Sequence, residues 1–147
     1  MDQHSYEQFT ARLLAQAQRD DQVLGLVAMG SMAAPQRRDR WSDHDFAWIV
    51  RTGSQEGYRQ HLDWLPDADQ IVLTLRETEH GLKVFYANGH LIEFAVFDLE
   101  ELGRARANDY AVLLDRADIT ARMQQVLAAT EPPPLDLAHE LAHVLSL

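Results

Sequence analysis

Residues 26–50, LVAMGSMAAPQRRDRWSDHDFAWIV, decide the fold of this chain. The segment predicts an apolar strand that ends in the turn Gly30-Ser31, then a loop or short helix, then a second strand that opens with Asp43 and Asp45. Side chains two residues apart in a strand project from the same face, so the two carboxylates would stand side by side. Because adjacent carboxylates repel each other, the pattern indicates a cation between them, and a divalent metal carrying a nucleoside triphosphate fits best.

The turn Gly30-Ser31 supplies groups that suit a phosphate. Glycine lets the backbone approach an anion and adopt a positive φ. Ser31 adds a hydroxyl, and the N–H groups that follow would open a helix N-terminus, which attracts anions. Arg37, Arg38 and Arg40 lie in the connecting loop and would contact the outer phosphates. The alternative is that these arginines belong to a solvated loop and bind no ligand.

Glu93 is a third carboxylate in an unexpected place. Its neighbours in HLIEFAVFD are apolar on both faces of a predicted strand, so we expect that strand to be well buried and Glu93 to be paired or metal-bound. The face that Glu93 occupies would also carry Asp43 and Asp45. Such a set of three carboxylates makes a site for one or two Mg²⁺ ions, because hard oxygen ligands without a His/Cys cluster favour Mg²⁺ over zinc. The alternative for Glu93 is an ion pair with an arginine such as Arg76.

Composition and charge limit the classes of function. With 147 residues, of which 46% are apolar and 24% charged, we expect one domain over residues 1–130, followed by a proline-rich break and a short C-terminal helix over 131–147. A formal charge of −10 argues against a broad nucleic-acid surface, which needs excess Lys and Arg. The N-terminus has no signal-peptide pattern and the sequence has no run long and apolar enough for a membrane span, so we expect a cytoplasmic protein.

Hydrophobic periodicity predicts an α/β (α+β) fold, with a mixed β-sheet of about five strands flanked by helices. Ser5 with Gln8 is typical of a capping box at the start of the first helix. The segments expected to be helices are 5–19, 54–65 and 118–129, and those expected to be strands are 23–29, 43–50, 70–75, 81–87, 90–98 and, at a possible edge, 110–116.

Asn88-Gly89 is the strongest turn signal in the chain. The dipeptide is typical of a two-residue hairpin turn between antiparallel strands. Such a turn pairs Ala87 with His90 and, counting outward, places Val84 opposite Glu93.

His44 and Trp48 alternate with the carboxylates along the second strand of the motif. Both side chains would point to the face opposite Asp43 and Asp45. We therefore expect His44 to be packed or surface-exposed rather than catalytic, and Trp48 to belong to the core.

His139-Glu140-Leu141-Ala142-His143 is a literal H-E-x-x-H, a pattern that can bind zinc on a helix. A zinc protease needs a third protein ligand, and Val144–Leu147 offer none. We interpret this segment as an amphipathic helix that docks through its apolar side chains.

These motifs, in this order, resemble the DNA polymerase β-like nucleotidyltransferase superfamily. Its pattern is an apolar strand, Gly-Ser, a spacer, Asp-x-Asp or Asp-x-Glu in a second strand, and a third acidic residue in a later strand. The longer string here, MGS followed by SDHDF, a Trp-containing helix and LIEF, is similar to the aminoglycoside 6-adenylyltransferase branch. The resemblance implies transfer of a nucleoside monophosphate, AMP from ATP, to a hydroxyl of a small-molecule acceptor such as an aminoglycoside-like antibiotic.

The resemblance also implies a role for each residue of the motif. Asp43 and Asp45 would bind two Mg²⁺ ions, and Glu93 would be a metal ligand or the general base on the acceptor hydroxyl. A two-metal clamp of this kind stabilises both the attacking and the leaving oxygen. The chain departs from the branch at Met32, where arginine is common, so phosphate contacts there are expected to differ.

The acceptor side of the site is the open question. The branch continues into a helical domain that helps to bind the acceptor, whereas this sequence reaches Leu147 soon after Pro132–Pro134. A homodimer or a helical partner chain would complete the site, unless the chain is a fragment or its acceptor is different. The other functions consistent with the sequence are a minimal nucleotidyltransferase acting on a protein or RNA partner, of the toxin–antitoxin type, and a non-catalytic nucleotide-binding module.

Overall fold

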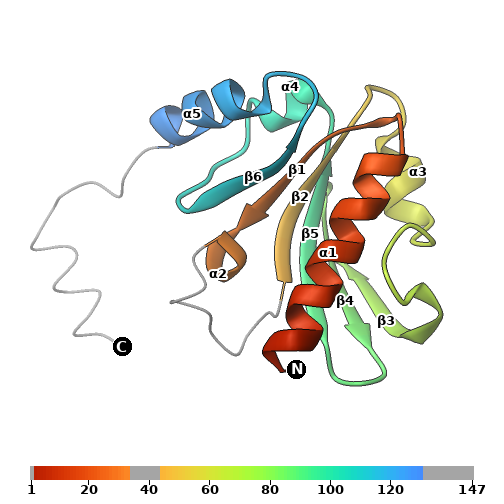
Figure 1. Ribbon diagram of the computed structural model, residues 1–147. Coiled ribbons are helices and arrows are strands. Elements are labelled where there is room, and N and C mark those ends of the chain that lie inside the picture. Colours follow the sequence, from red (N-terminus) through yellow and green to blue (C-terminus); the bar gives the residue numbers. More distant parts are fainter. Residues whose placement is uncertain (1, 34–43, 131–147) are drawn as a thin grey trace, which may run out of the picture.

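The computed structural model of this chain describes residues 2–33 and 44–130 (Figure 1). The predictions for 131–147 lie outside these residues. In the described part, no helix combines the length and apolar character that crossing a membrane requires. The helical elements are α1 (Gln3–Arg19), α2 (Gly30–Ala33), α3 (Gln55–Gln60), the 3-10 turn η2 (Ala68–Gln70), α4 (Leu99–Leu102) and α5 (Ile119–Ala129). The strands are β1 (Val23–Met29), β2 (His44–Val50), β3 (Ile71–Arg76), β4 (Gly81–Tyr86), β5 (Leu91–Phe97) and β6 (Tyr110–Asp115).

The strands form one mixed sheet in the order β3-β4-β5-β2-β1-β6. Only β2 and β5 pair in parallel, and the other neighbours are antiparallel. The predicted α/β class with a mixed sheet is confirmed, and the possible edge strand supplies β6. Strand β2 lies between β1, which leads into the Gly30 turn, and β5, which carries Glu93. The topology therefore gathers the three parts of the predicted motif at the middle of the sheet.

Helices cover both faces of the sheet (Figure 1). Helix α1 and the α3 region lie over one face, and α4 and α5 lie over the other. Strand β2 contributes side chains to the cores on both faces of the sheet. Phe46 and Trp48 pack beneath α1, and Ala47 and Ile49 pack beneath α5. The prediction that Trp48 belongs to the core is confirmed, since its side chain is fully buried.

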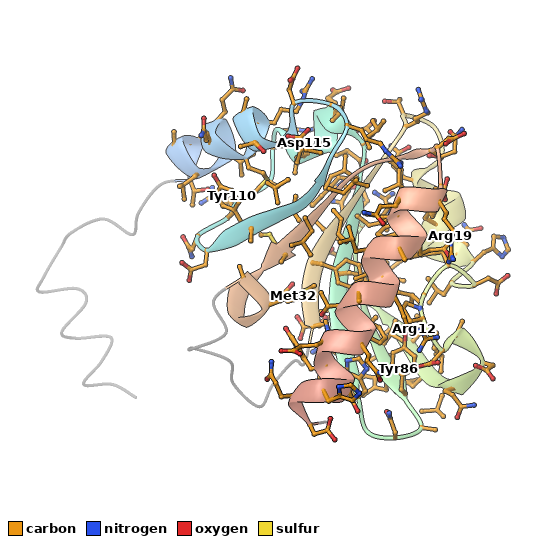
Figure 2. The ribbon with its side chains drawn as sticks, in the orientation of Figure 1. Arg12, Arg19, Met32, Tyr86, Tyr110 and Asp115 are labelled. Atoms are coloured by element: carbon orange, nitrogen blue, oxygen red, sulfur yellow. The ribbon has the colours of Figure 1, made fainter. Side chains whose placement is uncertain are left out.

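Helix α1 starts earlier than predicted. The Asp2 carboxylate accepts a hydrogen bond from the Ser5 backbone N–H at 2.7 Å, so Asp2 is the N-cap and the helix begins at Gln3. The predicted capping box at Ser5 is wrong, because a better acceptor precedes it. The apolar stripe of the helix is confirmed by its buried side chains, Tyr6, Phe9, Leu13 and Ala17. On the outer side of the helix, Arg12 and Arg19 project toward the segment that precedes β3 (Figure 2), where Arg12 pairs with Asp67 at 3.0 Å.

The turn between β4 and β5 is one residue longer than predicted. The Tyr86 N–H donates to the His90 carbonyl at 2.9 Å, which leaves Ala87, Asn88 and Gly89 in the turn. Gly89 adopts φ +88°, the left-handed conformation that closes a three-residue hairpin loop. An Asn-Gly pair serves this longer loop as well as the two-residue turn.

The longer turn shifts the strand register by one residue. Lys83 lies opposite Glu93, where Val84 was predicted, and Val84 lies opposite Ile92. A slip of one residue exchanges the two faces of a strand. Val84 is therefore fully buried beneath α1, and Lys83 joins Glu93 on the opposite face.

Helix α3 ends at Gln60, well before the predicted end at Leu65. The chain leaves the helix at His61, which has extended backbone angles. This break lets Trp64 turn into the core, where its ring stacks on Trp48 with centroids 4.3 Å apart. Tertiary packing therefore overrides the local helical pattern.

Gly25 lies where β1 packs closely against α5. A Cβ atom at this position would lie 2.7 Å from Cγ1 of the fully buried Ile119 and 3.3 Å from the Leu114 carbonyl oxygen. We predict that Gly25→Ala lowers the free energy of unfolding in urea by about 1–3 kcal/mol, because the core cannot take up the extra atom.

The matched control is Gly57→Ala in α3, where an added Cβ meets nothing within 4 Å. Alanine at this helical position should leave stability unchanged or raise it by about 0.5–1 kcal/mol. If Gly25→Ala unfolds at the same urea concentration as the unmodified chain, α5 does not pack on β1 as described.

Candidate active site

A cavity of about 470 Å³ opens on the sheet face opposite α1. Its floor comes from β2 and β5, and its walls come from the β3–β4 turn, the α4–β6 connection and α5. Pockets of roughly 300–1,000 Å³ are usual for small-molecule sites. Two of the predicted site residues, Asp45 and Glu93, line this cavity.

Asp45 and Glu93 are direct neighbours across the parallel strands β2 and β5. Their Cα atoms are register partners, so both side chains project from the same face of the sheet. Burial, and then the negative charge of Glu93, raise the pKa of Asp45 to about 6. The pair therefore resists carrying two negative charges unless a cation joins it.

Glu93 is less buried than the sequence suggested. Its side chain is 37% exposed, because β5 is fully buried only on the face beneath α1. The Lys83 Nζ atom lies 3.5 Å from Glu93 Oε1 and 3.7 Å from Glu77 Oε2. The predicted alternative partner, Arg76, instead pairs with Glu56. Glu93 thus faces Asp45 on one side and a cation on the other.

Gly30 brings the turn after β1 against this carboxylate pair. A Cβ atom at Gly30 would lie 3.3 Å from Asp45 Oδ2, and the residue adopts φ +51°. Both facts favour glycine, because a side chain would crowd the carboxylate and strain the backbone. The Gly30 N–H donates to the Asp109 carbonyl at 3.3 Å, which ties the turn to the segment entering β6.

The remaining predicted site groups are not placed by the structure. Gly30 begins helix α2, and Ser31 follows in that helix. The side chain of Ser31 lies outside the described part of the chain, as do the whole residues Asp43, Arg37, Arg38 and Arg40. Their roles stay predictions from the sequence.

His44 points away from the cavity and is packed, as predicted. Its ring stacks on Tyr6 with centroids 4.0 Å apart and lies 2.9 Å, Nδ1 to Nε2, from His90. The Thr10 hydroxyl lies 3.1 Å from the Tyr6 carbonyl oxygen and 2.8 Å from His44 Nε2, and it is hydrogen-bonded to both. These contacts fasten the start of β2 to α1 and so fix the strand that carries Asp45.

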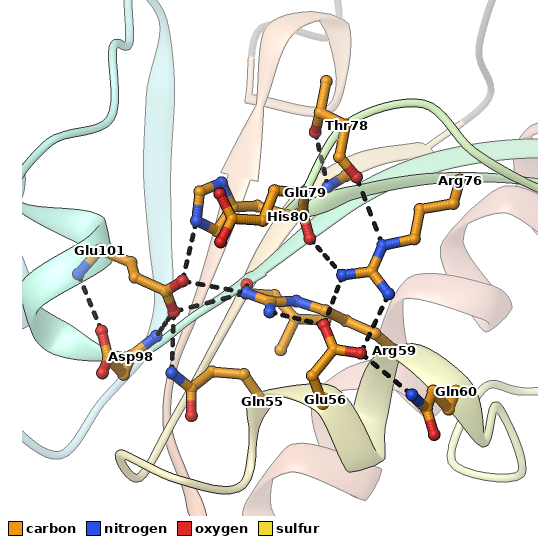
Figure 3. A network of polar contacts seen from close by, with 12 residues as sticks. Gln55, Glu56, Arg59, Gln60, Arg76, Thr78, Glu79, His80, Asp98 and Glu101 are labelled. Atoms are coloured by element: carbon orange, nitrogen blue, oxygen red, sulfur yellow. Dashed lines mark hydrogen bonds and ion pairs between the residues drawn. The ribbon is translucent and has the colours of Figure 1, made fainter.

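A buried ion pair holds the wall of the cavity beside α4 (Figure 3). The Arg59 side chain is 4% exposed and its Nη2 atom lies 3.3 Å from Glu101 Oε2. The same nitrogen donates to the Val96 carbonyl of β5. Asp98 and Glu101 cap α4 reciprocally, in a D-x-x-E pattern that sequence reasoning missed. The pair therefore joins α3, β5 and α4, and its loss would leave a buried charge without a partner.

Glu79, His80 and Glu101 gather at one corner of this network. One ligand atom from each lies within 4.8 Å of the others, a spacing that could hold a metal ion. The Glu101 oxygens, however, already accept from Asp98 N–H, Gln55, Arg59 and His80. Although burial raises the pKa of Glu101, these hydrogen bonds and the Arg59 charge lower it overall. We interpret the corner as a structural junction, because the buried Arg59 guanidinium already neutralises Glu101.

Asp45 and Glu93 are the better candidates for holding a metal. Their oxygen donors are of the type Mg²⁺ prefers, and they lie side by side in a cavity. Burial, and then the charge of Glu93, raise the pKa of Asp45, and a divalent cation between the two carboxylates would lower it. The residues present therefore fit the cation that the sequence motif implies.

Comparison with known families agrees with the resemblance carried by these motifs. A family model described as streptomycin adenylyltransferase matches residues 3–131, which is most of the chain. A search among curated proteins found no match.

The raised pKa of Asp45 makes stability depend on pH in a defined direction. Since the folded pKa is about 6 and the ordinary value is 3.8, the folded chain binds this proton more tightly than the unfolded chain between these pH values. Its contribution to stability is therefore lost as pH rises through that window. With a metal chelator present, we predict that Asp45→Asn raises the free energy of unfolding by about 1–3 kcal/mol at pH 7. This difference should vanish near pH 4.

Urea denaturation at several pH values measures this difference. Asp69→Asn is the matched control, because it removes an exposed carboxylate that does not line the cavity. A pH-independent difference for Asp45→Asn would contradict the raised pKa of Asp45.

Proposed function

This chain belongs to the streptomycin adenylyltransferase family, and from that premise we propose that it transfers AMP from ATP to a hydroxyl of an aminoglycoside-like acceptor. The observation that carries the proposal is the register of β2 and β5, which sets Asp45 beside Glu93 in a cavity of suitable size. The net charge of −10 suits a cationic acceptor. Two Mg²⁺ ions and ATP are the proposed cofactor and co-substrate.

Asp43, Asp45 and Glu93 would hold the metal ions in this proposal. When bound, Mg²⁺ supplies charge neutralisation for the phosphate oxygens and for the attacking and leaving oxygens. Gly30 and Ser31, with Arg37, Arg38 and Arg40, would bind the nucleotide. The packing of His44 beneath α1 and the Arg59–Glu101 pair keep the strand and the wall in place, which matters because positioning is much of what a protein contributes to this reaction.

The proposed transfer forms one bond and breaks another. The acceptor hydroxyl oxygen attacks the α-phosphorus of ATP, and the bond from that phosphorus to the oxygen bridging the β-phosphate breaks. Pyrophosphate leaves with the bonding electrons, and the hydroxyl proton passes to a base. Glu93 is the proposed base if it is not a metal ligand, and its 37% exposed side chain is open to an acceptor on this face.

A homodimer or a helical partner chain is the proposed source of further acceptor contacts. On the face of the sheet that carries Glu93, no described helix covers β3 and β4, and Leu73 and Leu75 are exposed there. Because the reaction consumes ATP, we place the protein in the cytoplasm, where that nucleotide is made and held.

Transfer of label from ATP tests this function. We predict that, with Mg²⁺ and ATP labelled at the α-phosphate, the chain labels streptomycin or another aminoglycoside in a panel and releases pyrophosphate. Asp45→Asn and Glu93→Gln should each lower the rate by about 10²- to 10⁴-fold, whereas Asp69→Asn should not. Mass spectrometry identifies the product as the acceptor plus one AMP group.

Three results would contradict the proposal in different ways. Binding of ATP without transfer to any aminoglycoside would favour a non-catalytic module. Label on a protein or RNA from the source cell would favour a partner-modifying enzyme. Equal rates for Asp45→Asn and the unmodified chain would show that the site is wrongly assigned.

A further inference from the structure

Arg104 and Arg106 differ from the other arginines of the described residues. Each of the others has a guanidinium that donates to a carboxylate, an amide oxygen or a backbone carbonyl: Arg12, Arg19, Arg51, Arg59, Arg76, Arg116 and Arg122. The guanidinium groups of Arg104 and Arg106 have no such contact with another described residue, and both side chains are exposed. In a chain with a formal charge of −10, these two cations are therefore available to an anion.

Both arginines line the cavity that Asp45 and Glu93 line. Among the described lining residues, they are the only lysine or arginine side chains. The nearby Lys83 is occupied by Glu93 and Glu77. The cavity thus has a carboxylate side on β2 and β5 and a cationic side on the α4–β6 connection.

Residues 103–109 connect α4 to β6 and form the arginine segment, whose backbone is held at several points. The Arg104 and Ala105 N–H groups donate to carbonyls of α4, and the Ala107 N–H donates to Thr130 Oγ1 at 3.1 Å, just after α5. Its end leads into Tyr110 at the start of β6, close to helix α2 (Figure 2). There the Asp109 carbonyl accepts from the Gly30 N–H at 3.3 Å. The arginine segment is therefore fixed against the same turn that contacts Asp45.

We propose that Arg104 and Arg106 bind the β- and γ-phosphates of the nucleoside triphosphate and hold the pyrophosphate that leaves. This inference rests on the proposed function, which puts the α-phosphate beside the carboxylates. A triphosphate that starts at Asp45 and follows the Gly30 turn meets the arginine segment with its outer, most negative groups. Arginine suits this task because its planar guanidinium donates two parallel hydrogen bonds to phosphate oxygens.

The proposed role of Arg104 and Arg106 also follows from the negative charge that builds up on the leaving pyrophosphate. When the bond to the α-phosphorus breaks, the leaving pyrophosphate gains negative charge, and a cation beside it favours that state over the intact triphosphate. The side of the cavity lined by carboxylates cannot supply this charge without metal. The structure thus assigns the two ends of one nucleotide to two different segments of the chain.

Calorimetric titration tests the assignment. The probes are a non-hydrolysable ATP analogue with Mg²⁺, pyrophosphate with Mg²⁺, and AMP, and the variants are Arg104→Gln, Arg106→Gln and the double variant. We predict that each single variant raises the Kd for the ATP analogue and pyrophosphate by about ten- to a hundredfold, with AMP changed less than about twofold. Arg104→Lys should recover part of the loss, because it restores the charge without the fork of donors.

Arg19→Gln is the matched control, since it removes the same charge from an exposed position on α1 that does not line the cavity. Urea midpoints of all variants should equal that of the unmodified chain, because the substituted side chains are exposed. If the arginine variants bind the ATP analogue as Arg19→Gln does, the inference is overturned while the proposed function stands.

Asp45→Asn separates this inference from the proposed function. If Asp45→Asn binds the Mg²⁺–ATP analogue unchanged but the arginine variants do not, the arginine assignment stands and the metal assignment fails. If the unmodified chain binds neither the ATP analogue nor pyrophosphate, both proposals are overturned.

Discussion

The repulsion between Asp45 and Glu93 is the constraint on which the rest of this site depends. Parallel pairing of β2 with β5 sets the two carboxylates in register on one face, and burial of Asp45 denies them the full screening of water. The fold maintains this unfavourable pair through its surroundings: Gly30 leaves room beside Asp45, and Lys83 offsets part of the charge on Glu93. A cation or a proton on such a pair relieves its repulsion, which makes the pair suited to the metal site proposed above.

Strand β2 explains how such a site stays rigid. Its alternate side chains lie in a dense aromatic core beneath α1, where His44 stacks on Tyr6 and Trp48 stacks on Trp64. A strand held in this way cannot easily twist or slide to relieve the carboxylate repulsion on its other face. The Arg59–Glu101 pair does the same for the cavity wall, because it links α3, β5 and α4 through one buried junction. Preorganisation of this kind is what a site needs if its groups are to meet a substrate without rearrangement.

Strand patterns predicted the mixed sheet. The expected shared face of Asp45 and Glu93 depended on which strands pair, and the parallel register of β2 and β5 confirms it. Local signals failed where tertiary packing decided the outcome. Trp64 ended α3 early by turning into the core, and the Asn88-Gly89 turn closed with three residues instead of two, which moved Lys83 beside Glu93. Arg104 was not predictable as a lining residue, because it reaches the cavity only through a connection whose path depends on contacts with α5 and the Gly30 turn.

Carbon-13 NMR of the labelled Asp45 carboxyl group measures whether Asp45 and Glu93 form a repulsive pair that a cation joins. Without metal, we expect this carboxyl group to titrate near pH 6, and we expect both Glu93→Gln and saturating Mg²⁺ to lower its pKa. A pKa near 3.8 that neither Mg²⁺ nor Glu93→Gln changes would show that the two carboxylates do not form such a pair.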